Sequence, residues 1–366
     1  MSEAARPATL PDGLHRGLFA RKIPSLDGFR ALAAWSVVGY HTHILPTPGD
    51  LGVLGFFVLS GFLITWLLLA EQERSGEISI KSFYIRRVLR IFPAYYAYWI
   101  VAVVSMALVM PQVPWRSTWA AFFYFSNYDA ALNGTSTSAL SHAWSLGIEE
   151  QFYLVWPALF LWLGRRGVRI EHALLWVIAG VWINRWSMML FYPNLNWLQM
   201  AFDMRCDHLF IGCCTAVAVR RGAVPWLWRW LCDRPWKLAL TFAALTASQL
   251  AIGWTGSEHM VIADYCIQPV LFAAIILQIV HFADHWSCRW LSSKPMAWLG
   301  AMSYSTYLWQ QLPTAMSRTT LEHWPVPARL AVACGGSLAM ACGSYYLIEK
   351  PFLRWKERIA ARPAIA

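Results

Sequence analysis

The stretch Leu51–Ala70, LGVLGFFVLSGFLITWLLLA, carries no charged side chain over twenty consecutive positions. About 20 apolar residues in a helix span the hydrocarbon core of a bilayer. An uninterrupted apolar run of this length is typical of a membrane-crossing helix rather than of a buried helix in a water-soluble domain. The stretch is therefore predicted to be a transmembrane helix.

The composition of the whole chain extends this prediction to a polytopic membrane protein. Of its 366 residues, 58% are apolar and only 14% are Asp, Glu, Lys or Arg, whereas an ordinary soluble domain has about 25% charged residues. The mean hydropathy is +0.41. The chain has too few polar side chains to cover the surface of a fold in water. A soluble enzyme, a disordered regulator and a coiled coil are therefore excluded as protein classes.

Further apolar segments along the chain have the length of a membrane span. The ten predicted spans are 27–45, 52–70, 93–110, 145–164, 172–192, 205–220, 236–254, 262–282, 297–316 and 327–348. The run Trp119–Phe125 is a candidate eleventh, interfacial segment. We therefore expect an all-α bundle of ten or eleven spans, made by one domain over residues 26–350 between tails at 1–25 and 351–366. The first 25 residues lack a signal-peptide core, so the first span is expected to direct insertion.

Positive charges alternate between successive loops. Lys and Arg gather in the amino-terminal tail and after the second, fourth, sixth, eighth and tenth spans, whereas the opposite loops hold little beyond Arg116 and Arg318. Cytoplasmic loops are enriched in Lys and Arg, so both termini are predicted to be cytoplasmic. The same enrichment explains the net charge of +10, and no nucleic-acid partner is expected. The eight cysteines form no CxxC pair, which favours free thiols over a disulfide framework or a metal site.

Two ionisable residues lie in the first predicted span. Arg30 and His41 are eleven positions apart, three helical turns plus about 20°, so they share one face roughly 16 Å apart along the axis. Ionisable groups deep in a span are expensive and usually face an internal cavity. The alternative is that Arg30 snorkels to the surface and His41 is an ordinary interfacial histidine.

A cationic stretch precedes the third span on the cytoplasmic side, with Lys81, Arg86, Arg87 and Arg90. Arg87 and Arg90 are three positions apart, so their guanidinium groups share a helical face and suit bidentate contacts with phosphate. The alternative is that these charges only orient the chain and contact anionic lipid.

Polar residues also begin the fourth and sixth spans. His142 and Glu149 are seven positions apart on one face, although Glu149 has the alternative role of a carboxylate near the positive end of a helix dipole. In the sixth span, Asp203 and Asp207 share a face, and the alternative to a binding role is an ion pair with Arg185 or Arg205.

Within the second span, Ser60 and Gly61 are expected to serve helix packing. Ser60 lacks the flanking glycines that mark a nucleophilic serine on a sharp turn. We therefore assign Ser60 no chemical role from the sequence.

Seven segments, in this order, resemble the acyltransferase-3 family of bacterial membrane O-acyltransferases. They are LDGFRALAA at 26–34 followed by His41, LGVLGFFVLSGFLI at 51–64, FYIRRVLRIFPAYY at 83–96, WSLGIEEQFY at 144–153, DMRCD at 203–207, LGAMSYSTYLW at 299–309 and LIEKPF at 347–352. Two positions depart from the family pattern. Leu54 stands where the family often has an acidic residue, and Gln310 stands where it usually has a histidine. Gln310 can form hydrogen bonds but cannot titrate.

The resemblance implies transfer of an acyl group, usually acetyl from cytoplasmic acetyl-CoA, to a carbohydrate hydroxyl at the bacterial inner membrane. Exopolysaccharide, lipopolysaccharide O-antigen, another surface glycan and a glycosylated small molecule remain open as acceptors, and so does a larger acyl donor. Some relatives carry a carboxy-terminal esterase-like domain; here the chain stops soon after the tenth span, so we expect transfer to finish within the membrane domain. A transporter or flippase using the same buried polar residues is the alternative, and a non-catalytic scaffold is a third possibility.

The resemblance also suggests roles for the polar residues. A sugar hydroxyl needs a base within hydrogen-bond reach, and we hypothesise that His41 takes its proton, that Glu149 or His142 orients the base or the acceptor, and that Arg30 stabilises the donor or developing negative charge. The residues expected to bind polyanionic acyl-CoA are Tyr84, Arg86, Arg87 and Arg90. Those expected to bind the acceptor are Trp144, Tyr153, Asp203, Arg205 and Asp207. No metal is expected, and the sequence does not predict an oligomeric state.

Overall fold

The chain folds into helices that follow the predicted apolar segments. The structure, a computed structural model, describes residues 10–20, 22–45, 47, 49–135, 138–192, 194–255 and 258–360, and these contain no β-strand. The helices over the first eight predicted spans are α2 (Pro24–Thr42), α3 (Gly49–Ser75), α4 (Ile80–Val109), α7 (Ala143–Arg165), α8 (Ile170–Phe191), α10 (Phe202–Arg220), α12 (Trp236–Thr255) and α13 (Glu258–His281). The prediction of an all-α, polytopic helical bundle is confirmed.

The ninth and tenth predicted spans are less regular. Residues 297–316 were expected to form one helix, but they lie in three, α14 (Lys294–Ala301), α15 (Ser303–Trp309) and α16 (Gln311–Thr319), separated by Met302 and Gln310. The tenth span forms one continuous rod. Its parts are α17 (Val326–Leu330), the π-helical turn η2 (Ala331–Gly335), α18 (Gly336–Ser344), the π-helical turn η3 (Tyr345–Glu349) and α19 (Lys350–Ala360).

Four of the described helical segments are long and apolar enough to cross a membrane by length and composition. They are Gly49–Ser75, Ile80–Val109, Ile170–Phe191 and Val326–Trp355. The chain is thus a multi-pass membrane protein, and the count of ten crossings stays a prediction. The candidate eleventh segment falls on α5 (Trp115–Phe122), whose 8 residues extend only about 12 Å and cannot cross a bilayer.

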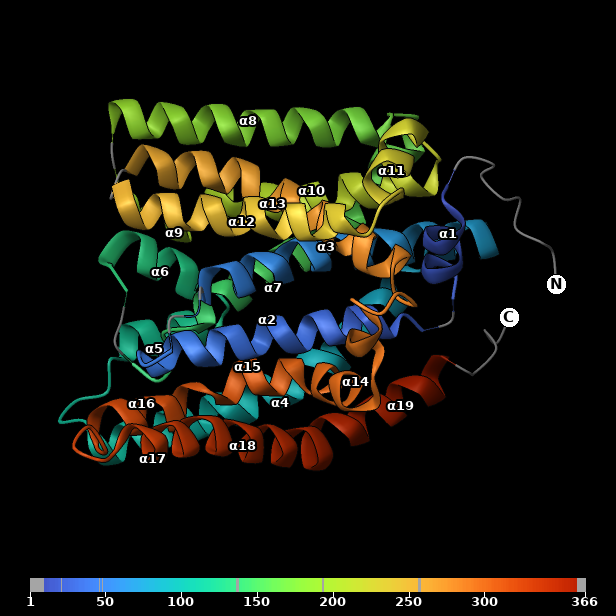
Figure 1. Cartoon of the computed structure of the whole chain (residues 1–366). Coiled ribbons are helices and arrows are strands. Elements are labelled where there is room, and N and C mark those ends of the chain that lie inside the picture. Colours follow the sequence, from blue (N-terminus) through green and yellow to red (C-terminus); the bar gives the residue numbers. More distant parts are fainter. Residues whose placement is uncertain are drawn as a thin grey trace.

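Short helices cap the two ends of the bundle (Figure 1). At one end, called the α1 end, lie α1 (Asp12–Leu18), α11 (Pro225–Cys232) and α19. At the opposite end, called the α6 end, lie α5, α6 (Ser126–Asn133) and α9 (Leu195–Met200). The first and last described helices therefore lie at the same end, as two cytoplasmic termini require. The assignment of the α1 end to the cytoplasm remains a prediction.

Helix α3 is the centre of the packing and contacts α2, α7, α10 and α13. It meets α10 backbone to backbone, because a Cβ added to Gly61 would lie 1.9 Å from the Leu209 carbonyl oxygen and one added to Gly212 would lie 2.1 Å from that of Val58. Small residues allow such close approach between membrane helices. The packing role predicted for Gly61 therefore matches its place in the fold.

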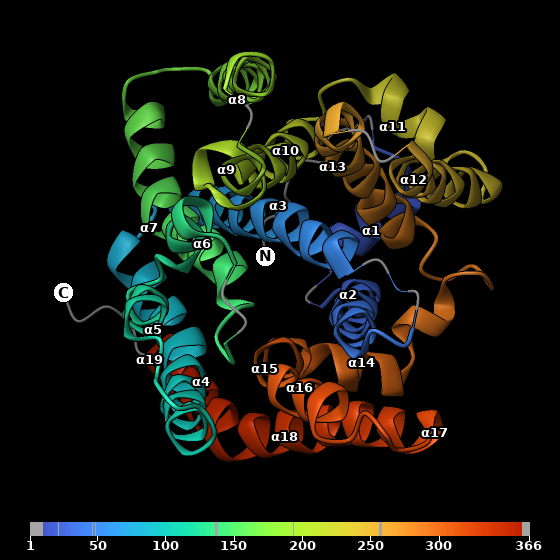
Figure 2. The same ribbon diagram turned by 90° about the vertical axis from the view of Figure 1, so that its left-hand side faces the viewer.

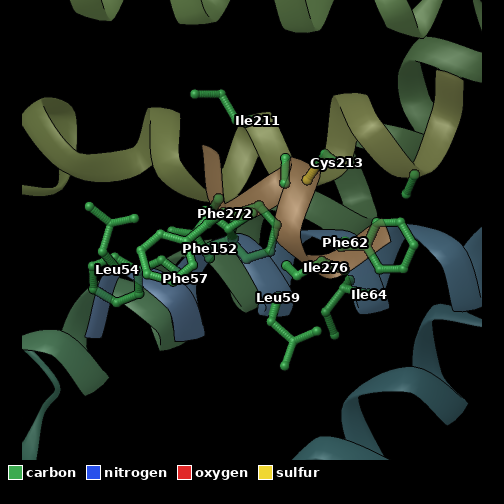
Figure 3. Packing of buried hydrophobic residues seen from close by; sticks show 14 of the residues in the cluster. Leu54, Phe57, Leu59, Phe62, Ile64, Phe152, Ile211, Cys213, Phe272 and Ile276 are labelled. Atoms are coloured by element: carbon green, nitrogen blue, oxygen red, sulfur yellow. The ribbon is translucent and has the colours of Figure 1, made fainter. Parts of the chain in front are cut away.

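A dense apolar core fills the space around α3. Its cluster contains Phe57 and Phe62 of α3, Ile211 of α10 and Phe272 of α13, and Figure 3 shows Phe57 among the rings of Phe152 of α7 and Phe272. On the other side of α3, the view along the bundle in Figure 2 places α2, α4, α7 and α15 around a common centre. The functional candidates from the sequence concentrate in that second region.

Candidate functional site

A cleft lies between α2, α3, α4, α7 and α15. Its polar lining residues are Arg30, Ser60, Arg87, Arg90, Ser145, Glu149, Glu150, Tyr153, Ser303, Tyr304 and Tyr307. A second hollow shares Arg30, Leu63, Arg87 and Arg90 with it and adds Arg86 and Glu71. The two hollows adjoin at the shared residues, and the first is hereafter called the cleft and the second its mouth.

Guanidinium groups dominate the mouth. Arg86 is neutralised there, since its Nη2 lies 3.0 Å from Glu71 Oε2. Neither Arg87 nor Arg90 forms an ion pair with any carboxylate among the described residues. Arg30 has a long contact, with its Nη1 3.7 Å from Asp27 Oδ1. The structure therefore gathers three guanidinium groups whose charges are largely available to an anion.

Arg87 is held by an aromatic ring rather than by a carboxylate. Its guanidinium carbon lies 4.0 Å from the ring centre of Tyr153, a cation–π contact. This leaves the N–H groups of Arg87 free to donate. Tyr84, predicted beside it in the donor site, instead donates from its hydroxyl to the carbonyl of Leu154 over 2.6 Å and ties α4 to α7.

In the middle of the cleft, Glu149 belongs to a chain of hydrogen bonds between α3 and α7. Ser60 Oγ donates to Glu149 Oε1 over 2.8 Å, and the Tyr153 hydroxyl donates to Ser60 Oγ over 2.9 Å. The carboxylate lies in the electrostatic field of Arg30, Arg87 and Arg90. A carboxylate so held keeps a fixed orientation and a second oxygen for other partners.

Ser60 thus has a position that the sequence did not indicate. Hydroxyls within helices commonly donate to the carbonyl four residues earlier, as Thr215 does to Ile211 and Ser337 does to Ala333. Ser60 instead turns its proton across the cleft to Glu149. Its partners lie 89 and 93 positions away, so no local pattern could have identified the contact.

Ser145 of α7 and Tyr307 of α15 both line the cleft, and their hydroxyls are hydrogen-bonded to each other. Tyr307 also donates to the carbonyl of His142 over 3.1 Å. His142 is only 2% exposed, and its imidazole packs against the rings of Tyr98 and Tyr307, with ring centres 5.4 and 5.7 Å away. The Leu308 backbone is a hydrogen-bond partner of this imidazole.

His41 is not part of the cleft. It occupies the last turn of α2, half-buried, and lines neither the cleft nor its mouth. His41 and His142 are close enough to interact electrostatically, and Arg318 and His43 are further charged or titratable neighbours of His41. Arg30 therefore lines the cleft as expected, whereas His41 lies outside it in the neighbourhood of His142.

The residues predicted on α10 lie on the other side of α3. Asp207 forms a fully buried ion pair with Arg185, with Asp207 Oδ1 2.6 Å from Arg185 Nη2, and also accepts from the Trp182 indole over 2.9 Å. The ion-pair alternative considered for Asp207 is therefore the arrangement in the structure. Asp203 accepts from the Trp197 indole over 3.3 Å.

Arg205 and Trp144 are likewise outside the lining of the cleft. The Arg205 guanidinium carbon lies 4.1 Å from the ring centre of Tyr265 and 5.8 Å from that of Trp144. Of the five residues predicted to bind the acceptor, only Tyr153 lines the cleft.

Some residues that line the cleft were not predicted from the sequence. Glu150, Ser303, Tyr304 and Tyr307 all line it. The doublet Glu149–Glu150 and the run LGAMSYSTYLW identified two segments of the chain as candidates for a site. Neither pattern shows which side chains of its segment face the cleft. Within the described part of the chain, no cluster of three or more His, Cys, Asp or Glu side chains is arranged to hold a metal ion.

Comparison with known proteins gives a consistent result. A family model described as an acyltransferase domain matches residues 23–349. The peptidoglycan O-acetyltransferase OatA of Listeria monocytogenes is 31% identical over 91% of this chain and 56% of its own length. A Bacillus subtilis protein provisionally named a peptidoglycan O-acetyltransferase is 30% identical over 92% of this chain and 56% of its own.

A third relative, from Staphylococcus aureus strain COL, is provisionally named an O-acetyltransferase. It is 29% identical over 91% of this chain and 57% of its own length. This chain thus spans a little over half the length of the curated relatives that it matches. No solved structure matches it.

Proposed function

We propose that this chain, which belongs to the acyltransferase-3 family, moves an acyl group, most simply acetyl, from acyl-CoA to a hydroxyl of a carbohydrate. Its family membership confirms the resemblance drawn from the seven sequence segments. The donor, the acceptor and the roles of individual residues are part of the proposal.

The observation that carries the proposal is the placement of Arg30, Arg87 and Arg90 in one cleft that also contains Glu149. Coenzyme A carries several phosphate charges, and guanidinium groups bind phosphate with paired, charge-assisted hydrogen bonds. Arg87 and Arg90 at the mouth would hold that end of the donor. A thioester arm extending past Arg30 would then approach Ser145 and Tyr307.

The α1 end is proposed to face the cytoplasm, because the donor is cytoplasmic and the mouth of the cleft opens toward this end. Glu71 of the mouth lies in the same helix and near the same end as Glu73, whose Oε2 lies 2.5 Å from Arg220 Nη2. Arg220 in turn packs over Phe19, directly after α1. The acceptor side is then the α6 end, and the bacterial inner membrane is the membrane proposed for this protein.

For the chemical step, we keep His41 as the proposed general base. A neutral imidazole is the group most often used to take a proton from a hydroxyl, and His142, which lies within electrostatic range of His41, is proposed to orient it or the acceptor. Glu149, fixed by Ser60, and Arg30 would orient the donor from the middle of the cleft. Arginine charge near the thioester favours the oxyanion that develops during acyl transfer.

The names of the relatives favour peptidoglycan as the carbohydrate. They give no particular support to exopolysaccharide or lipopolysaccharide. Peptidoglycan glycan strands are therefore the first acceptor to test.

The test of the proposed function uses the purified full-length chain in detergent with isotopically labelled acetyl-CoA and peptidoglycan glycan strands. The proposal predicts labelled O-acetyl ester on the glycan together with free coenzyme A. The transporter or flippase alternative predicts flux of a solute in reconstituted vesicles without any labelled ester. A scaffold would show neither.

A further inference from the structure

Past Tyr307, α15 and the residue after it carry buried polar atoms without a hydrogen-bond partner, on residues that line neither the cleft nor its mouth. They are Thr306 Oγ1, Trp309 Nε1 and Gln310 Nε2, and the buried imidazole of His142, which bonds the Leu308 backbone, lies nearby. Thr306 and Gln310 are 0% exposed, His142 is 2% and Trp309 is 9%. We refer to His142, Thr306, Trp309 and Gln310 as the outer polar cluster.

The members of the outer polar cluster come from two neighbouring places in the fold. His142 directly precedes α7, and the others lie in the last turn of α15 and at its break with α16. The ring of Tyr98 joins the two places, since its centre lies 5.4 Å from that of His142 and 5.2 Å from that of Trp309. Thr306 and Gln310 are one helical turn apart, flanking Tyr307 of the cleft wall.

This concentration of unpaired groups is unusual. In folded proteins about 90% or more of buried polar groups have a hydrogen-bond partner, and ligand sites are mainly apolar pockets with a few converging polar groups. The outer polar cluster therefore has the properties of a place that a polar ligand completes.

The outer polar cluster also differs in charge from the cleft. Its side chains are an imidazole, a hydroxyl, an indole and an amide, without a carboxylate, an ammonium or a guanidinium group. The guanidinium groups of Arg30, Arg87 and Arg90 line the cleft and its mouth. The two regions are thus suited to different ligands, one anionic and one neutral.

We propose that the outer polar cluster is the acceptor subsite and binds a neutral, hydroxyl-bearing sugar unit of the carbohydrate. This inference rests on the proposed acyl transfer and names the part of the site where the acceptor sits. The indole N–H of Trp309 and the amide N–H of Gln310 donate to sugar oxygens, while an imidazole nitrogen of His142 accepts from a sugar hydroxyl. Gln310 donates without carrying charge, which keeps the subsite neutral.

The first experiment separates acceptor binding from donor binding. The variants are Gln310→Leu, which removes the amide, and Trp309→Phe, which removes the indole N–H. Gln278→Leu is the matched control, because Gln278 is equally buried but lies in α13, where its Nε2 donates to the Leu231 carbonyl. Kinetics are measured with acetyl-CoA and chitotetraose, a neutral oligosaccharide, and coenzyme A release is also measured without any glycan.

The inference predicts a KM for chitotetraose raised about tenfold in each of the two cluster variants, as expected for a lost hydrogen bond to a ligand. The KM for acetyl-CoA and the glycan-free release of coenzyme A stay at wild-type values, and Gln278→Leu behaves as wild type. An unchanged chitotetraose KM in both cluster variants overturns the inference. So does an equal rise in the KM for acetyl-CoA. If Gln310→Leu does not fold, the chitotetraose KM of Trp309→Phe alone decides whether the inference holds.

The second experiment tests the neutral character of the subsite with the wild-type protein. Chitotetraose is compared with tetragalacturonate, which has a carboxylate on every sugar unit. Preference for chitotetraose supports the inference, and equal or better acetylation of tetragalacturonate overturns it while leaving the proposed function intact. Failure of the wild-type protein to transfer acetyl to these or any glycan strands contradicts the proposed function itself.

Discussion

Ser60 of α3 donates a hydrogen bond to Glu149 of α7 across the cleft, over 2.8 Å. The contact joins a helix of the apolar core to the helix that carries the doublet Glu149–Glu150. Tyr153 extends it by donating to Ser60, and the Tyr153 ring supports the Arg87 guanidinium. The Arg87 guanidinium and the Glu149 carboxylate are therefore linked through Tyr153 and Ser60.

Removing the Ser60 hydroxyl should impair turnover without unfolding the protein. In Ser60→Ala, Glu149 loses its fixed hydrogen bond, and we expect acetyl transfer to fall roughly 10- to 100-fold, the range for a hydrogen bond to a charged group. The measurement is kcat for labelled acetyl transfer. Ser337→Ala is the control, because Ser337 lies within a helix as Ser60 does but donates only to the Ala333 carbonyl. Equal activity of Ser60→Ala and wild type would remove this network from the mechanism.

The arginines of the mouth should determine donor affinity. Replacing Arg87 and Arg90 together with Gln removes two charges that have no carboxylate partner, and we expect acetyl-CoA to bind on the order of 100-fold more weakly. Affinity is measured by titration with desulfo-CoA, a non-reactive analogue that retains the phosphates. Arg166→Gln serves as the control, since Arg166 only packs over the Trp162 ring. Unchanged affinity in the double variant would place the phosphates elsewhere.

His41 is predicted to be needed for chemistry rather than for folding. His41→Ala should lower kcat by about 10²–10⁴-fold, the usual contribution of a positioned general base, with a normal yield in the membrane. His43→Ala controls for the loss of a neighbouring imidazole, since His43 is exposed and contacts Arg318. Wild-type turnover in His41→Ala would transfer the role of the base to another residue, with His142 and Glu149 the candidates.

The buried pair Asp207–Arg185 should serve stability. Removing one partner leaves an uncompensated buried charge, so Asp207→Ala is expected to destabilise the protein by about 3–5 kcal/mol. Thermal unfolding in detergent is the measurement. The double variant Arg185→Met, Asp207→Leu should regain most of the loss, because an apolar pair of similar size avoids the buried charge. A folded Asp207→Ala protein with a specific loss of acceptor affinity would instead support the binding role predicted from the sequence.

The sequence predicted those features that depend on composition and local spacing. The run Leu51–Ala70 and the other apolar segments indicated the helices, because a bilayer demands length and apolarity from each span separately. Arg30 and Glu149 were identifiable because ionisable groups in such segments usually face a cavity. Asp207 was open to two interpretations, and its fully buried contact with Arg185 required the packing of α8 against α10 to be known.

The features that the sequence did not predict depend on contacts between distant segments. Ser60 and Tyr307 are residue types that commonly serve packing between helices. They line the cleft only because α3, α7 and α15 pack around it. The breaks at Met302 and Gln310 were also unexpected. Residues 297–316 have the apolar content of one span. A hydropathy value is an average over the whole segment, so it does not show where the helix within the segment is interrupted.

The most direct test of the central claim is mass analysis of peptidoglycan glycan strands after incubation with carbon-13-labelled acetyl-CoA, comparing wild-type protein with the Arg87→Gln, Arg90→Gln double variant. Labelled O-acetyl ester with the wild type, and a large reduction with the double variant at limiting donor, is the predicted result. Absence of labelled ester from wild-type samples in which the protein is folded and binds acetyl-CoA would contradict acyl transfer to this carbohydrate through the cleft.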